Sequence, residues 1–183
     1  MNRFDLAIGG LAGKRVVDLG SGPGHYALEF ARRGADVTCV DVSAAYIALA
    51  RRRLESERLT ATFAIGYMDD VVRLTGGQFD GAFCNVSWYY CMHDLRFAGR
   101  IISALRPGGV AVVRAHNSDY EPDRGPMRRA IYFLNETLCW KIGHPHPPRG
   151  RILFAFQRIR GCEAESEYSD PLLDVVIARR QAY

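Results

Sequence analysis

The sequence predicts an α/β fold, with a doubly wound and mostly parallel sheet of seven strands that ends in a C-terminal antiparallel hairpin. Short apolar runs suited to buried strands recur along the chain, and helical patterns separate them. The alternation stops after residue 115, and two later apolar runs have no predicted helix between them. A length of 183 residues is enough for one sizeable core, so a single domain over 1–183 is expected.

Composition excludes several classes of protein. Hydrophobic residues make up 48% and charged residues 24%, which is typical of a globular domain rather than a disordered or collagen-like chain. No run approaches the roughly 18 apolar residues of a membrane span, and the N-terminus lacks a secretory signal, so no membrane partner is expected. Five cysteines without paired spacing predict free thiols and a cytoplasmic location. The net charge of +4 permits an anionic partner without requiring one.

The first half of the chain predicts three strands with helices between them. Residues 15–19 form the first strand, which stops at a glycine-rich turn, and residues 25–33 carry a helical pattern. Residues 36–40 predict the second strand. Ser43 is a suitable N-cap for a helix that runs to about residue 55. The third strand is expected over 60–65, followed by a turn.

The second half begins regularly and then departs from the alternation. Strand four is expected over 79–86, a helix over 94–105, and strand five over 110–115. Residues 116–150 form an insertion with one helix over about 127–141. The apolar runs 152–159 and 172–178 predict an antiparallel pair at the edge of the sheet.

The turn after the first strand predicts a nucleotide-binding site. Gly20, Gly22 and Gly24 remove Cβ atoms where the chain turns sharply, so a ligand can approach the backbone closely. The following helix offers unpaired N–H groups to an anion. Asp41 closes the second strand, at the position where a carboxylate can accept hydrogen bonds from ribose hydroxyls. These features favour an adenosine that carries an anionic or zwitterionic tail.

The glycine spacing separates two cofactor classes. The dinucleotide fingerprint GxGxxG would place its third glycine at position 25, which holds His25. The observed GxGxG, two residues after Asp18, resembles the first motif of the class I S-adenosylmethionine-dependent methyltransferases. The resemblance extends over residues 15–115 and to the terminal hairpin. It implies a Rossmann-like methyltransferase fold, S-adenosyl-L-methionine as cofactor and S-adenosyl-L-homocysteine as product.

The resemblance also assigns roles to particular residues. It implies that Asp18 orders the loop and faces the methionine ammonium, and that Asp41 binds the ribose diol. The turn at 66–69 resembles the adenine-contacting motif, with Tyr67 where the family often has an acid, so either Asp69 or the backbone of Met68 contacts adenine. The expected cofactor-binding residues are Asp18, Gly20, Ser21, Gly22, Gly24, Asp41, Val42, Met68, Asp69 and Asn85.

Candidates for binding or activating the methyl acceptor follow strands four and five. His93 and His116 are candidate general bases, although His93 would also suit a helix start where it binds only backbone. Tyr89 and Tyr90 either shape the acceptor pocket or pack as ordinary aromatics, and Asn117 faces the same rim.

Arginines and histidines of the insertion have different expected roles. Arg124 and its neighbouring arginines would suit a carboxylated or phosphorylated acceptor, or RNA. His144 and His146 lie in a proline-rich stretch without further ligands at regular spacing, so they are assigned to a solvent loop and no metal is expected.

These residues favour a methyltransferase that acts on N or O of a small-molecule acceptor. The alternatives are an RNA methyltransferase and a catalytically silent partner subunit. Asn85-Val86-Ser87-Trp88 differs from the Asn/Asp-Pro-Pro-Tyr/Phe typical of enzymes that methylate exocyclic base nitrogens. The 116–150 insertion is expected to form the substrate lid. Exposed Phe133, Leu134 and Trp140 would alternatively mark a homodimer contact.

Overall fold

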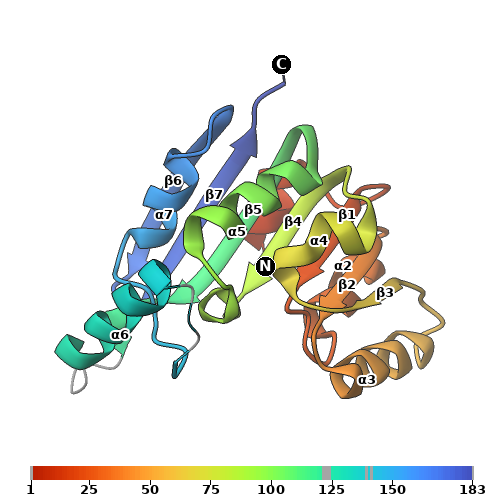
Figure 1. The fold of residues 1–183 in the computed structure, drawn as a ribbon. Helices are drawn as coiled ribbons and strands as arrows, with labels where there is room; N and C mark the ends of the chain where they lie inside the picture. Colours follow the sequence, from red (N-terminus) through yellow and green to blue (C-terminus); the bar gives the residue numbers. More distant parts are fainter. Residues whose placement is uncertain (1, 121–124, 139, 141, 183) are drawn as a thin grey trace.

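The computed structural model describes residues 2–120, 125–138, 140 and 142–182, and these form a sheet covered by helices on both faces (Figure 1). The helices and strands follow in the order α1 (Asn2–Ile8), β1 (Arg15–Leu19), α2 (His25–Arg32), β2 (Asp36–Asp41), α3 (Ala44–Glu55), β3 (Thr62–Ile65), α4 (Val71–Thr75), β4 (Phe79–Asn85), α5 (Asp94–Ala104), β5 (Leu105–His116), α6 (Gly125–Leu138), α7 (Arg151–Gln157), β6 (Cys162–Asp170) and β7 (Leu173–Arg180). Short 3-10 turns stand at η1 (Met68–Asp70), η2 (Trp88–Tyr90) and η3 (Ser118–Tyr120).

The sheet has seven strands in the order β3-β2-β1-β4-β5-β7-β6. Strands β1 to β5 pair in parallel, and β7 pairs antiparallel with both β5 and β6. This arrangement confirms the predicted fold class. It also brings the carboxyl ends of β1, β2 and β4 together at one edge, where open α/β sheets bind their ligands.

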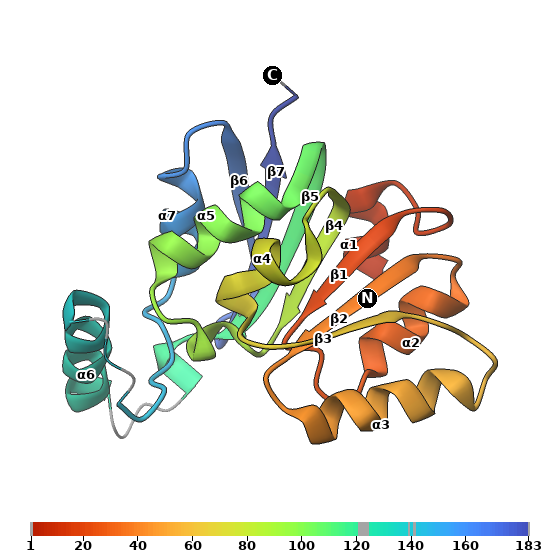
Figure 2. The ribbon, with the colours of Figure 1, turned by 45° about the vertical axis from the view of Figure 1, so that its right-hand side comes forward.

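Two hydrophobic clusters lie on opposite faces of the sheet because side chains alternate along each strand. Val17 belongs to the cluster that α4, α5 and α7 cover, and Val16 belongs to the one covered by α1, α2 and α3. Figure 2 shows α4, α5 and α7 in front of the sheet, whereas α6 stands away from it. Within the described residues, none of the helices combines the length and apolar character needed to cross a membrane.

One element of the expected hairpin is wrong. Residues 152–159 fall mostly in helix α7, and the strand that pairs with β7 is β6, whose sequence is largely polar. Ile152, Ala155 and Phe156 bury one face of α7 at spacings of three and four residues. Strand β6 needs no apolar run, because it is an edge strand, and its glutamates blunt that edge against pairing with another chain.

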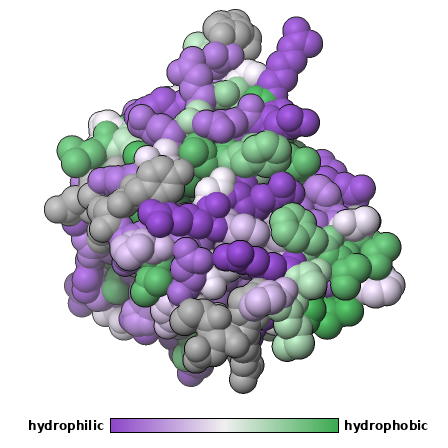
Figure 3. Space-filling model, turned by 90° about the vertical axis from the view of Figure 1, so that its left-hand side faces the viewer, coloured by the Kyte–Doolittle hydropathy of each residue, from purple (hydrophilic) through white to green (hydrophobic). Residues whose placement is uncertain are grey.

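The insertion helix α6 presents hydrophobic side chains to the surface. Met127, Phe133 and Leu134 are each about half exposed or more, and Trp140 beyond the helix is similarly exposed. Figure 3 views the molecule from the left-hand side of Figure 1 and shows hydrophobic residues in several places, with a broad group at the lower right. The expectation that Phe133, Leu134 and Trp140 are exposed is therefore confirmed, and the dimer contact stays a prediction.

Candidate cofactor and acceptor site

The glycine loop after β1 is built from left-handed backbone conformations. Gly20, Gly22 and Gly24 have φ of 67°, 52° and 77°, which residues with a Cβ rarely adopt. A Cβ on Gly20 would lie 2.6 Å from the Cβ of Ser87, and a Cβ on Gly24 would lie 2.7 Å from that of Ala50. The loop therefore lies so close to the segment after β4 and to α3 that neither Gly20 nor Gly24 leaves room for a Cβ atom.

Asp41 ties this loop to the end of β2. Its Oδ2 accepts a hydrogen bond from the backbone N–H of Gly22 at 2.8 Å, and its Oδ1 accepts one from the N–H of Ser43 at 2.8 Å. The residue is 9% exposed, and it lines a cavity beside the loop. A ligand in that cavity therefore meets a carboxylate whose position the backbone has already fixed.

Asp18 lies on β1 just before the loop, and its pKa is strongly shifted. Burial, and second the charge of Asp41, raise the pKa of Asp18 to about 7, against the lowering effect of the Ala27 backbone N–H. Its Oδ2 has no hydrogen-bond partner within the described protein. A buried acceptor of this kind suits a nearby cation, such as an ammonium group.

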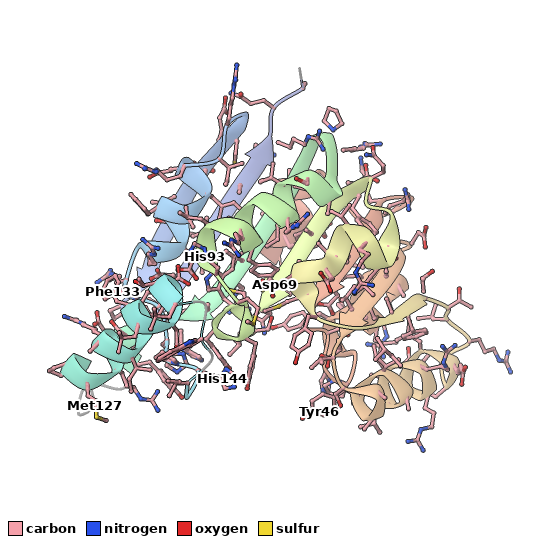
Figure 4. The ribbon with its side chains drawn as sticks, in the orientation of Figure 1. Tyr46, Asp69, His93, Met127, Phe133 and His144 are labelled. Atoms are coloured by element: carbon pink, nitrogen blue, oxygen red, sulfur yellow. The ribbon has the colours of Figure 1, made fainter. Side chains whose placement is uncertain are left out.

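A cavity of about 510 Å³ opens at the carboxyl ends of β1, β2 and β4. Its volume is within the range of small-molecule and cofactor sites. Its wall is mainly apolar, and it includes no arginine or lysine among the described residues. Figure 4 shows Tyr46 of α3 and His144 of the insertion on opposite sides of this end of the sheet. The lining consists of Gly20, Gly22, Val40, Asp41, Val42, Ser43, Tyr46, Tyr67, Met68, Asn85, Val86, Ser87, Tyr90, Met92 and His144.

The expected cofactor-binding residues divide into two groups around this cavity. The wall itself includes Gly20, Gly22, Asp41, Val42, Met68 and Asn85. The second group, Asp18, Ser21, Gly24 and Asp69, does not line it. Asp69 accepts a hydrogen bond on Oδ1 from the backbone N–H of Met92 at 3.0 Å, which joins the turn after β3 to the segment after β4. The Oδ1 of Asn85 is buried and has no hydrogen-bond partner among the described residues, so it can accept a hydrogen bond from a ligand.

Among the expected acceptor residues that the structure describes, only Tyr90 reaches the cavity. Tyr90 lines it, and Tyr89 packs beside Tyr90 with ring centroids 4.6 Å apart. His116 stacks on Tyr120 at 4.0 Å. Asn117 is fully buried and donates to Asp174 and to the carbonyl of Pro171, both at 3.0 Å, so it supports the fold beneath the rim.

His93 does not line the cavity. Its Nδ1 lies 3.8 Å from a carboxylate oxygen of Glu136 on α6, so the ring faces the insertion helix (Figure 4). Arg124, the arginine expected to contact the acceptor, lies outside the described residues. Arg151 forms ion pairs with Asp94 at 3.1 Å and with Glu136 at 3.2 Å. It does not line the cavity.

The sequence did not point to several residues of the wall. Tyr46 and His144 line the cavity, and no motif marked them, whereas Val86 and Met92 belong to the segment after strand four where site residues were expected. His144 was assigned to a solvent loop, yet it borders the same space as Asp41. Gly143-His144-Pro145 gave no usable signal, because a residue before a proline normally adopts extended backbone, whereas His144 has φ of 48°.

No group of three or more histidine, cysteine, aspartate or glutamate side chains among the described residues could hold a metal ion. The polar groups at the cavity are instead backbone amides, the Asp41 carboxylate and the Asn85 amide oxygen, within a mainly apolar wall. This set fits the nucleoside and amino-acid groups of S-adenosylmethionine.

Comparison with known proteins supports the same interpretation. A family model described as a methyltransferase domain matches residues 16–109, just over half of the chain. The ubiquinone biosynthesis O-methyltransferase of Acinetobacter baumannii (strain ACICU) is 30% identical over 110 residues, and that of Acinetobacter baylyi is 32% identical over 113 residues. Each alignment covers 60% of this chain and 46% of the relative, so the chain spans less than half the length of these curated relatives.

Solved structures share the fold at lower identity. An S-adenosylmethionine-dependent methyltransferase from Mesorhizobium loti is 22% identical with a TM-score of 0.69, and the match covers 93% of this chain and 92% of that one. The [4+2]-cyclase SpnF has a TM-score of 0.73 at 18% identity, over 100% of this chain and 81% of that one. With the glycine loop, Asp41 and the cavity in place, the chain belongs to the class I S-adenosylmethionine-dependent methyltransferases.

Proposed function

We propose that this chain transfers a methyl group from S-adenosylmethionine to a hydroxyl oxygen of a small, uncharged acceptor. The observation that carries this proposal is that one cavity begins at the glycine loop and Asp41 and ends at Tyr90 and His144. A single continuous space lets donor and acceptor meet without solvent between them. The choice of oxygen over nitrogen is supported by the names of the similar curated proteins, which are O-methyltransferases.

The cofactor half of the cavity is formed by β1, β2 and the turn after β3. When bound there, S-adenosylmethionine supplies an activated methyl group on a sulfonium. Asp41 would hold the ribose, because its carboxylate is already fixed beside the cavity by two backbone N–H groups. The rings of Tyr46 and Tyr67 border the outer part of this half and offer flat surfaces to adenine.

The acceptor half is formed by the segment after β4 and by the proline-rich part of the insertion. Tyr90, Met92 and His144 line it, and none carries a fixed charge. A carboxylate or phosphate brought into this half would find no arginine or lysine among the described residues of the wall, so burying that charge would cost free energy. An uncharged acceptor avoids that cost.

The same geometry points to a smaller part of residues 116–150 as the substrate lid. His144 from the proline-rich segment lines the cavity, whereas α6 stands away from the sheet (Figure 2). We therefore propose that residues 142–148 close the acceptor side and that α6 anchors this segment from outside.

The test is a transfer assay with radiolabelled S-adenosylmethionine and paired acceptors of similar size. We expect methylation of neutral phenols and alcohols, and much weaker methylation of analogues that add a carboxylate. Exclusive methylation of carboxylated or phosphorylated acceptors, or of RNA, would contradict the proposed acceptor class.

A further inference from the structure

The cavity has one imidazole in its wall, and it belongs to His144. Among the other histidines near this edge of the sheet, His93 faces Glu136 and His116 stacks on Tyr120. His146 packs edge-on against Tyr89 at 4.8 Å. The imidazole of His144 is solvent-exposed at the mouth, and its ring centroid lies 4.9 Å from that of Tyr90.

The backbone at this end of the cavity is held in an uncommon conformation from two sides. His144 has φ of 48° and Val86 has φ of 54°, and both are left-handed residues with a Cβ. They come from segments far apart in the sequence, yet both line the same cavity. Such conformations persist only where the surroundings enforce them, and they concentrate at ligand-binding and reacting centres.

Contacts with distant parts of the chain hold the segments that carry both residues. The N–H of Val86 donates to the carbonyl of Arg114 on β5 at 2.7 Å, which anchors the segment after β4. Pro145, directly after His144, is buried, and the N–H of Ser118 donates to the carbonyl of Pro147 at 2.9 Å. The imidazole is therefore presented to the cavity by an anchored backbone.

We propose that His144 is a catalytic residue that accepts the proton of the acceptor hydroxyl. In this step the acceptor oxygen forms a bond to the methyl carbon, the carbon–sulfur bond breaks with its electron pair left on sulfur, and the hydroxyl proton passes to a ring nitrogen of His144. The inference rests on the proposed oxygen methylation, and it assigns the base to a residue of the insertion rather than to His93 or His116.

The first test asks whether His144 shares a space with the cofactor, and it does not require turnover. Diethyl pyrocarbonate modification of each histidine is followed by mass spectrometry with and without S-adenosylhomocysteine. We expect the bound nucleoside to slow modification of His144 several-fold. The matched control is His25, an exposed histidine whose Nδ1 lies 2.8 Å from Arg53 and which does not line the cavity, and its rate should not change.

The second test uses two probe acceptors, phenol and 4-nitrophenol, because 4-nitrophenol ionises near neutral pH without help from a base. His144→Asn removes the imidazole but tolerates a left-handed backbone, and His25→Asn is its matched control. We expect His144→Asn to lower the single-turnover rate with phenol by a factor of about 100 or more. The rate with 4-nitrophenol should fall much less, and S-adenosylhomocysteine affinity should stay within about a factor of three.

The outcomes separate this inference from the proposed function. Unchanged modification of His144 in the presence of bound S-adenosylhomocysteine overturns the placement of the imidazole. Equal losses with both phenols, or a larger selective loss in His93→Asn or His116→Asn, overturn its role as base. A wild-type chain that methylates only nitrogen acceptors contradicts the proposed function itself.

Discussion

Asp41 accepts hydrogen bonds from the N–H of Gly22 in the glycine loop and from the N–H of Ser43 after β2, and the same carboxylate borders the cavity. Replacing it with alanine should therefore act on both stability and binding. We expect Asp41→Ala to lower the free energy of unfolding by about 1–3 kcal/mol, because two part-buried backbone donors lose a charged partner. Urea denaturation measures this loss.

The matched control for Asp41 is Asp36→Ala at the exposed start of the same strand. Asp36 forms only an exposed ion pair with Arg15 at 4.0 Å, so its loss should change the free energy of unfolding by less than about 1 kcal/mol. Equal effects of the two substitutions would show that Asp41 does not order the loop.

Gly20 tests how closely the loop approaches Ser87. Gly20→Ala adds a Cβ 2.6 Å from the Cβ of Ser87 in a left-handed residue. Gly13→Ala adds one at nearly the same φ, 70° against 67°, with open space around it. We expect Gly13→Ala to cost about 1 kcal/mol from backbone strain alone. Gly20→Ala should cost about 1–3 kcal/mol more from the clash, as measured by chemical denaturation, and equal costs would contradict the tight approach.

Among the single residues of the cavity, the sequence predicted some and missed others for a physical reason. Asp41 and the glycines were accessible because their roles depend on local spacing along one strand–turn–helix unit. His144 was not, because its place in the wall depends on how the insertion folds back, through contacts such as the Ser118 N–H to the Pro147 carbonyl. No local pattern encodes such a contact.

Among the elements, the insertion helix α6 is joined to the domain by buried polar side chains around Asp94. The Trp88 Nε1–H donates to Asp94 Oδ1 at 2.8 Å, and the hydroxyl of Tyr132 on α6 donates to Oδ2. Arg151 of α7 pairs with Asp94 at 3.1 Å and with Glu136 of α6 at 3.2 Å. One carboxylate thus connects η2, α5, α6 and α7.

The pKa of Asp94 makes this junction pH-dependent. Burial, and second the charge of Glu136, raise this pKa to about 6 from the ordinary 3.8. Since the folded chain binds the proton more tightly than the unfolded chain, this group's contribution to stability falls as pH rises from about 4 to about 6. Asp18 shifts in the same direction, to about 7.

We therefore expect Asp94→Asn to flatten the fall of stability with rising pH in that window. The change in slope should correspond to about 1–3 kcal/mol between pH 4 and pH 6.5, since one pKa unit is worth about 1.4 kcal/mol. Urea midpoints of the wild-type and variant chains at pH 4, 5 and 6.5 measure it. Parallel curves for the two chains would contradict the assignment.

The mistaken element also shows where sequence patterns reach their limit. Residues 152–159 are apolar enough for a strand, but their burial follows helical spacing at Ile152, Ala155 and Phe156. A short apolar run does not distinguish these two conformations, because its period is hidden when nearly every residue is hydrophobic. Strand β6 was missed for the opposite reason, since an edge strand can be polar throughout.

For the whole molecule, the doubly wound and mostly parallel sheet was predictable from the alternation of strands and helices and from the family that the glycine turn resembles. The sheet then places the cavity at the carboxyl ends of β1, β2 and β4 without further information. The chemistry of the acceptor side depends on the insertion, which the fold does not determine. The sequence accordingly named more residues of the proposed cofactor half of the wall than of the proposed acceptor half.

The central claim is that this cavity binds the methyl donor through Asp41 and the glycine loop. Calorimetric titration with S-adenosylhomocysteine, with NAD as the control titrant, tests it most directly. We predict saturable binding of S-adenosylhomocysteine and no binding of NAD. The affinity for S-adenosylhomocysteine should weaken by a factor of about 10 or more in Asp41→Ala and stay unchanged in Asp36→Ala. Binding of NAD instead, or equal affinity of S-adenosylhomocysteine for the wild-type and Asp41→Ala chains, would contradict it.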